Sequence, residues 1–230
     1  MTKTELAVDH RTRVAAERRE RTRAKLLESA LQVFAEKGPE AAVIDDVIAL
    51  AGMARGSFYN YFRTNDELMA GVAAELSEEL LRLIDPVVRR YEDPAARVAC
   101  GGRLLLHAVR SYPLLGAFLS RLKLPVTGGQ LIGVAFLVRD LDAGISQQRF
   151  APMLVRVAID LVTGTLLCAA QSQSREALPA NYPEAVVHAV LLGLGIAADE
   201  ATRLVALPLP EIELPDNSIL KRTAAAGNET

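Results

Sequence analysis

A short stretch near the N-terminus, residues 52–62, concentrates side chains that can bind a nucleic acid. It reads GMARGSFYNYF and holds four of the 11 aromatic residues of the chain. On a helix, Phe58 and Phe62 share one face, which predicts that they anchor the stretch in a core. The outward arc then carries Arg55, Ser57, Tyr59, Asn60 and Tyr61.

These outward residue types match those that contact DNA. Arginine pairs bidentately with guanine and asparagine with adenine in the major groove, whereas tyrosine and serine mostly hold phosphates. Gly56 has no side chain, so a helix can approach a duplex closely there. We expect this arc to contact DNA. The alternative is that Tyr59 and Tyr61 are ordinary half-buried aromatics.

Two further helices are needed to position this stretch. Apolar residues at helical spacing predict a first helix over residues 22–37, and Gly38 and Pro39 follow as stop signals. The same spacing predicts a second helix over residues 44–51, which Gly52 ends. With a third helix over residues 55–62, the order is helix, short glycine-containing turn and helix, which is the helix-turn-helix arrangement.

A longer helix is expected to follow this unit directly. The run Thr64-Asn65-Asp66-Glu67 is a capping box, and apolar spacing continues from it toward Pro86. The remainder has further helical periodicity and no alternating strand pattern of any length. The sequence therefore predicts an all-α protein.

The N-terminal 20 residues lack apolar periodicity, so we predict a flexible arm over residues 1–20. Positions 10–25 carry seven basic and two acidic residues, although the whole chain has a formal net charge of −2. Such asymmetry favours contact between this end and a polyanion. We hypothesise that the arm reaches into a DNA groove, as arms do in other helix-turn-helix proteins. A solvated tail is the alternative.

Composition argues against several other classes of protein. The two cysteines lie far apart, which favours a reducing cytosol over a disulfide framework. The most apolar stretch, residues 185–198, is shorter than the roughly 20 residues of a membrane span, so we expect a cytoplasmic protein without a membrane partner. The three scattered histidines indicate neither a metal site nor an enzyme, and no cofactor is expected.

The run IDDVIALAGMARGSFYNYFRTNDEL closely resembles the DNA-binding segment of TetR-family transcriptional regulators. The preceding run AKLLESALQVFAEKGPEAA is similar to the first helix of that family, so the resemblance covers roughly residues 21–70. A later run, FLVRDLDAGISQQRF, is also similar to a stretch common in the C-terminal halves of the family, although this is weaker evidence.

The resemblance implies a homodimer of about nine helices per chain that binds double-stranded operator DNA, usually as a repressor. The last two long helices would form the dimer interface. The matched positions imply DNA contacts by Arg55, Gly56, Ser57, Tyr59, Asn60 and Tyr61, and backbone contacts near Arg21 and Arg23. Three positions depart from the family pattern, namely Val43, Ala54 and Asn65, where the family usually has a capping Thr or Ser, a capping Ser and a Lys.

The domains follow from these observations. After the arm, we expect a helix-turn-helix DNA-binding domain over residues 21–66 and a larger ligand-binding and dimerisation domain over residues 67–207. The proline-spaced residues 208–230 are expected to form a disordered tail. The helices expected at residues 152–173 and 182–198 are apolar nearly all round, so each must be covered on every side. A four-helix dimer interface would do so, and burial within a monomer is the alternative.

A regulator that responds to a small molecule needs an effector site in the larger domain. Arg103, His107 and Arg110 form one polar stripe, which could seat an anion if it faces inward and is a solvated face otherwise. Phe118, Phe136 and Cys168 are candidate apolar wall residues of this site. Small pockets in helical bundles are mostly apolar, which favours a hydrophobic or amphipathic effector. The alternative function is a helical protein of this fold that binds a protein partner or ligand without sequence-specific DNA binding.

Overall fold

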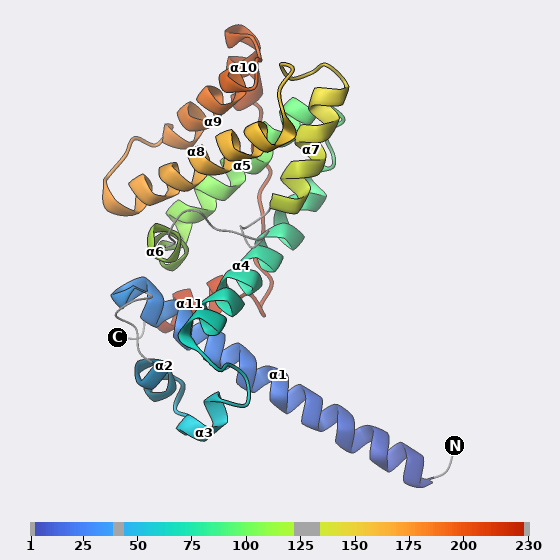
Figure 1. Ribbon diagram of the computed structural model, residues 1–230, viewed down its shortest axis with the longest axis vertical. Helices are drawn as coiled ribbons and strands as arrows, with labels where there is room; N and C mark the ends of the chain where they lie inside the picture. The colour runs from blue at the N-terminus through green and yellow to red at the C-terminus, as the bar shows by residue number, and fades with distance from the viewer. Residues whose placement is uncertain (1–2, 39–43, 122–133, 228–230) are drawn as a thin grey trace. The chain divides into compact units, whose positions relative to one another are not determined.

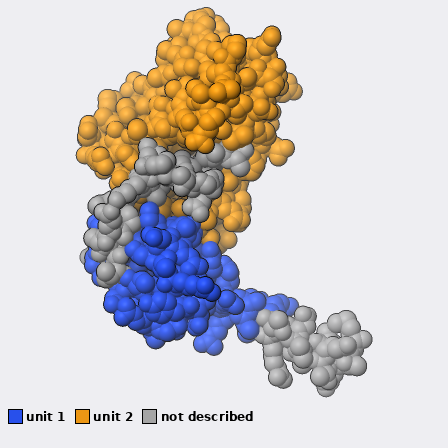
Figure 2. Space-filling model, viewed as in Figure 1, with its two compact units in different colours: residues 1–72 blue, residues 73–230 orange. Residues whose placement is uncertain are grey.

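The computed structural model describes residues 3–38, 44–121 and 134–227. Over these residues the chain forms eleven α-helices and no strand (Figure 1). It divides into two compact units, Met1–Val72 and Ala73–Thr230 (Figure 2). The all-helical prediction is confirmed, and the helix count is close to the expected nine.

The first unit contains α1 (Lys3–Lys37), α2 (Ile44–Ala51), α3 (Arg55–Phe58) and the beginning of α4 (Asn65–Val88). Its core is made of fully or almost fully buried side chains from all four helices and the turn after α3: Leu26, Leu27, Leu31, Phe34, Val47, Phe58, Phe62 and Leu68. This is the helix-turn-helix core that the apolar spacing predicted.

The turn between α2 and α3 depends on Gly52. Its φ of 61° is in the left-handed region, which glycine adopts without steric cost. The Met53 amide donates to the Ile48 carbonyl (3.0 Å) and the Gly52 amide to the Ala49 carbonyl (3.1 Å). These two bonds form a Schellman motif, which ends α2 and turns the chain toward the recognition segment.

The expected flexible arm is instead helical. Residues 3–20 form the first half of α1, a single helix of 35 residues. The segment is rich in Ala, Glu and Arg, which have high helix propensity, and Arg13 pairs with Glu17 one turn away (3.9 Å). Residues 13–20 are exposed on every side, so this part of α1 has no apolar face from which a helix could be predicted.

The start of α4 confirms the predicted capping box with one difference. The Glu67 amide donates to Thr64 Oγ1 (3.1 Å), while Glu67 Oε2 accepts from the amide of Arg63 rather than that of Thr64 (2.7 Å). The boundary between the units lies at Val72 and Ala73, inside α4, and not at residues 66 and 67 as predicted. One continuous helix therefore belongs to both units.

The second unit holds the rest of α4 and seven further helices. These are α5 (Pro94–Ser111), α6 (Pro113–Arg121), α7 (Val134–Ser146), α8 (Val155–Arg175), α9 (Tyr182–Gly193), α10 (Ala198–Val205) and α11 (Ile219–Gly227). Helix α5 is central, since it packs against α7, α8 and α9, and α6 packs against α8. Asp93 caps α5 by accepting from the Ala95 amide (3.0 Å), and Pro94 follows in the first turn.

Two predictions about the C-terminal third were wrong. The helix expected over residues 182–198 ends at Gly193, the chain turns at Gly195 (φ 89°), and α10 begins at Ala198. The tail expected to be disordered contains α11, in which Ile219 and Leu220 are buried. The start of α11 is stabilised by Glu79, a residue about 140 positions away in the sequence, so no local pattern indicated this helix.

Candidate DNA-contact face and effector cavity

The recognition segment is anchored by two phenylalanines, as predicted from their spacing. Phe58 is fully buried and Phe62 almost so, and their ring centroids lie 6.1 Å apart. The α-helix itself is shorter than the expected 55–62, because α3 ends at Phe58. After Phe58 the chain continues with hydrogen bonds between residues three apart. The Asn60 amide donates to the Ser57 carbonyl (3.3 Å) and the Tyr61 amide to the Phe58 carbonyl (2.8 Å).

The polar residues of this segment lie on its outer side. Arg55, Gly56, Tyr59 and Asn60 are exposed, with 47% of Tyr59 accessible, while Ser57 and Tyr61 are half-buried. No neighbouring atom lies within 4 Å of where a Cβ of Gly56 would be, so the backbone is open at that point. The six residues form one contiguous polar surface, which we call the recognition face.

Arg55 is oriented by its neighbours on the recognition face. Its guanidinium lies 3.7 Å from the Asp45 carboxylate of α2. A hydrogen bond with Tyr59 and the charge of Asp45 raise the pKa of Arg55 above its ordinary value. The group is therefore a permanent cation on this exposed surface, as a contact to a guanine or a phosphate requires.

The basic half of α1 reaches the recognition face. The Arg19 guanidinium lies over the ring of Tyr61, 5.9 Å from its centroid, which is cation–π geometry. Of the two backbone contacts that the resemblance implied, Arg21 is exposed, while Arg23 is half-buried and lies 3.9 Å from Glu20. Ala54 provides no side-chain cap for α3, and Val43, at the expected cap of α2, lies outside the described residues.

The polar stripe on α5 does not line the apolar cavity among α4, α5, α6, α7 and α8. Arg103 is buried and donates to Glu184 Oε1 of α9 (3.2 Å) and to the Leu207 carbonyl (2.7 Å). His107 Nε2 lies 2.9 Å from the same Glu184 oxygen. Arg110 donates to the carbonyls of Pro179 and Ala180 (3.0 and 2.9 Å).

This stripe is a structural network that fastens α5 to α9 and its neighbouring loops. Partial burial raises the pKa of Glu184, but hydrogen bonds from His107 and Arg103 outweigh that effect and lower it below its ordinary value. The expected anion-binding site is therefore already occupied by the Glu184 carboxylate of the same chain. The prediction erred because helical spacing places the stripe on one face without indicating which partner that face meets.

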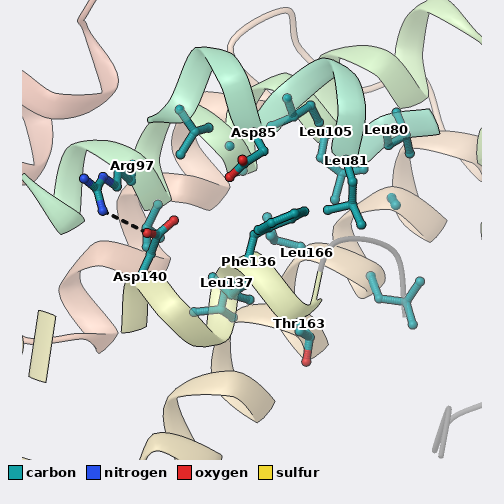
Figure 3. Close-up of a pocket in the computed structure, with 18 of the residues that line it drawn as sticks. Leu80, Leu81, Asp85, Arg97, Leu105, Phe136, Leu137, Asp140, Thr163 and Leu166 are labelled. Carbon is teal, nitrogen blue, oxygen red and sulfur yellow. Dashed lines mark hydrogen bonds and ion pairs between the residues drawn. The ribbon is translucent and has the colours of Figure 1, made fainter. Parts of the chain in front are cut away.

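An apolar cavity of about 130 Å³ lies among α4, α5, α6, α7 and α8 (Figure 3). Most of its wall is formed by leucine, valine and isoleucine side chains, with Phe136 projecting among Leu81, Leu137 and Leu166. We call it the effector cavity. Of the predicted wall residues, only Phe136 lines it. Phe118 is fully buried in the core, and Cys168 is exposed on α8.

Charged groups gather at one end of the effector cavity. Asp140 of α7 is almost fully buried and accepts from Arg97 (3.2 Å) and from Arg139 through both oxygens (2.9 and 3.0 Å). The hydrogen bond with Asp140 raises the pKa of Arg139, although partial burial opposes the shift. Arg139 in turn lies over Phe136, 5.3 Å from the ring centroid.

Asp85 supplies a second carboxylate at this end. Its buried Oδ1 lies 2.9 Å from Arg139 Nη1 in an ion pair, but it accepts no hydrogen bond of standard geometry from the described residues. A buried acceptor without a donor costs free energy. A hydroxyl group on a bound molecule would supply the missing donor.

Three charged residues at the cavity were not predicted from the sequence, namely Asp85, Arg97 and Asp140. Each comes from a different helix, so no local spacing brings them together. The run FLVRDLDAGISQQRF contains Phe136, Arg139 and Asp140. Its similarity to a stretch common in the C-terminal halves of the family was the only sequence feature that pointed to these residues. Only the fold shows that the charged residues of this run, which lie on α7, are close to Asp85 of α4.

The described residues contain no group of three or more His, Cys, Asp and Glu side chains placed to hold a metal ion. One described helix, α8, is long and apolar enough to span a membrane by length and composition, and a third of that apolar window is buried in this chain. The core helix of a water-soluble protein can have the same length and apolar composition.

The fold and these sites define a helix-turn-helix unit joined through α4 to a helical unit with an apolar cavity. Residues 26–72 match the family model described as "Bacterial regulatory proteins, tetR family". The regulator YvdT of Bacillus subtilis is 36% identical over 69 residues, which are 30% of this chain and 36% of that protein. This chain thus matches about a third of the length of that relative.

Longer matches extend into the second unit. The repressor Rv3405c of Mycobacterium tuberculosis is 28% identical over 156 residues, or 64% of this chain and 82% of that protein. The crystal structure of RolR in complex with its ligand resorcinol superposes with a TM-score of 0.70 at 29% identity, covering 86% of this chain and 100% of that one. Together these findings support a TetR-family transcriptional regulator.

The network around Glu184 predicts a pH-dependent contribution to stability. Replacing Glu184 by Gln should lower the free energy of unfolding at neutral pH by about 1 to 3 kcal/mol, because the bonds to Arg103 and His107 lose their charge. Since the folded-state pKa is lowered, this contribution is fully present above the ordinary carboxyl value of 4.5. It is lost as the pH falls through the folded-state pKa.

Urea denaturation across a pH series would measure this difference, with Glu176→Gln at an exposed position as the control. If Glu184→Gln were as stable as that control at neutral pH, the network would have no structural role.

Proposed function

We propose that this protein is a repressor that binds a palindromic operator as a homodimer and is released by a small amphipathic effector. The observation that carries this proposal is the recognition face, in which two buried phenylalanines leave Arg55, Tyr59 and Asn60 exposed together. A ligand-responsive DNA-binding regulator is the coarser function that the family and its ligand-bound relative support.

On DNA, the recognition face would enter the major groove. Arg55 and Asn60 would read base edges, while Ser57, Tyr59 and Tyr61 would hold phosphates, with Gly56 allowing close approach. The basic half of α1 would add phosphate contacts near Arg21 and Arg23. Its Arg19 already meets Tyr61, so α1 and the recognition face would bind as one surface.

The apolar surfaces of α8 and α9 support a dimer. In the single chain Leu154 is 75% exposed, Val157 52% and Leu192 42%, which are large values for such side chains. Gly164 of α8 has open space beside it, so another helix could approach closely at that point. A second copy of the chain would cover these residues across a twofold axis.

The effector cavity fits a single-ring molecule that carries hydroxyl groups. Its volume of about 130 Å³ is near that of an engineered cavity, about 150 Å³, that takes up benzene. The ring would pack against Phe136 and the leucines, while a hydroxyl would donate to Asp85 Oδ1, the acceptor that lacks a donor. RolR, whose structure holds resorcinol, provides a resorcinol-binding precedent at 29% identity.

Coupling would pass along α4, which lines the effector cavity and continues into the recognition unit. Recognition helices of a dimer need a separation of about 34–36 Å to enter successive major grooves. An effector that tilts α4 would change this separation and release the operator. A coupling of a few kcal/mol is sufficient for such control.

Arg55 should be essential for operator binding. Replacing it by Ala should weaken binding by about 5- to 150-fold, since a bidentate contact to guanine contributes about 1–3 kcal/mol. Fluorescence anisotropy with duplexes from the DNA flanking its own gene would measure the change, with the folded state checked by circular dichroism. Arg82→Ala, an exposed arginine in the second unit, is the matched control. Equal affinity of the two variants would contradict the proposed face.

Dimer formation should depend on Val157. Glutamate at this exposed apolar position would place charges in the interface, so Val157→Glu should sediment as a monomer at micromolar concentration and lose operator affinity. Ala74→Glu, a change at an exposed position of α4, should remain a dimer. A Val157→Glu variant that sediments as the wild type would rule out this surface as the interface.

Asp85 should determine recognition of hydroxyl groups by the effector cavity. Isothermal titration with resorcinol should show binding, and Asp85→Asn should weaken it at least tenfold, because a hydrogen bond to a charged group contributes about 1.5–3 kcal/mol. Asp142→Asn, on the exposed side of α7, is the control. Failure of the wild type to bind resorcinol, phenol or catechol would exclude this effector class.

A further inference from the structure

Residues 208–227 pass from α10 along α4 and end in α11, drawn in red in Figure 1. We call them the C-terminal strap. Near its beginning, Leu209 and Ile212 pack against a buried cluster that contains Val87 and Val88 of α4 together with Cys100 and Leu104 of α5. Farther along, Ile219, Leu220 and Thr223 of α11 are buried. The strap is therefore a packed part of the second unit.

A single carboxylate on α4 fastens the strap. Glu79 Oε1 accepts from Ser218 Oγ (2.6 Å), and Glu79 Oε2 accepts from the Ile219 amide (2.7 Å). Ser218 Oγ itself accepts from the Lys221 amide (3.0 Å), so Ser218 caps α11 while it is held by Glu79. A carboxylate at the start of a helix is also favoured by the helix dipole. We call these bonds the Glu79 clasp.

The packing between the strap and α4 is incomplete. A cavity of about 190 Å³ lies among α4, α5 and the strap, with Leu83, Ala108 and Leu214 in its wall. Protein interiors are normally close-packed, and voids of this size are few. Leu80 and Ile84 line both this space and the effector cavity. One segment of α4 therefore has the effector cavity on one side and unfilled space on the other.

We propose that the strap sets the response to the effector. The Glu79 clasp holds α4 in its operator-competent position, and the space behind α4 receives the helix when an effector fills the opposite cavity. This inference rests on the proposed function, because it assumes that α4 carries the signal. It assigns a regulatory role to a segment whose composition suggested disorder.

Two changes should act in opposite directions. Loosening the clasp frees α4, so the operator-competent state becomes less populated and less effector is needed to leave it. Filling the space behind α4 blocks its movement, so more effector is needed. General destabilisation of the second unit would shift both variants in the same direction.

Glu79→Gln tests the clasp in the full-length protein, with Glu78→Gln as the matched control. Glu78 is adjacent on α4, but its partner is the exposed Arg82 (2.6 Å) rather than the strap. Relative to the control, Glu79→Gln should bind the operator about fivefold more weakly and release it at an about fivefold lower resorcinol concentration. Equal values for the two variants would overturn the proposal.

Ala108→Leu tests the space behind α4. This variant should bind the operator as the wild type does, but its release should require about tenfold more resorcinol. If its release instead shifted to lower concentration, as in Glu79→Gln, the space would not receive α4 and the proposal would fail.

Hydrogen exchange provides a measurement that requires neither operator nor effector. Amides of residues 73–88 should exchange faster in Glu79→Gln than in Glu78→Gln, because the clasp no longer restrains α4. Faster exchange in a protein that ignores every operator would support the clasp and contradict only the proposed function. Unchanged exchange would contradict the clasp itself.

Discussion

The arrangement of the first unit depends on the burial of Phe58 and Phe62. Each ring removes a large apolar area from water, and together they fix the rotation of the recognition segment about its own axis. Once that rotation is fixed, Arg55, Tyr59 and Asn60 can only point outward. Gly52 contributes the sharp turn that brings the segment to the core. The polar surface is thus a consequence of apolar packing.

The same physical basis explains why the sequence predicted the first unit well. Its core residues are close in the chain, and spacings of three and four identify them directly. Where the prediction failed, the cause was a partner distant in sequence. Arg103 and His107 contact Glu184, and Asp85 forms an ion pair with Arg139. No local sequence pattern predicts either pairing. Likewise the start of α11 is held by Glu79, a residue about 140 positions away in the sequence.

The effector cavity and the polar stripe illustrate two uses of charge inside one helical unit. In the stripe, Glu184 satisfies its cationic partners, so the network is closed and serves stability. At the cavity, the groups around Asp140 are paired, but Asp85 keeps one oxygen without a donor. An incomplete network beside an apolar space can be completed by a molecule from outside, whereas a complete one cannot. That difference distinguishes the proposed effector site from a structural support.

Helix α4 belongs to both units, and this has a consequence for how such proteins can be recombined. Because the unit boundary lies inside the helix, a different sensor can be grafted only through a helical junction. Each residue inserted there would rotate everything before it by about 100°, since a helix has 3.6 residues per turn. Functional chimaeras should therefore tolerate length changes near the junction only in steps close to whole turns.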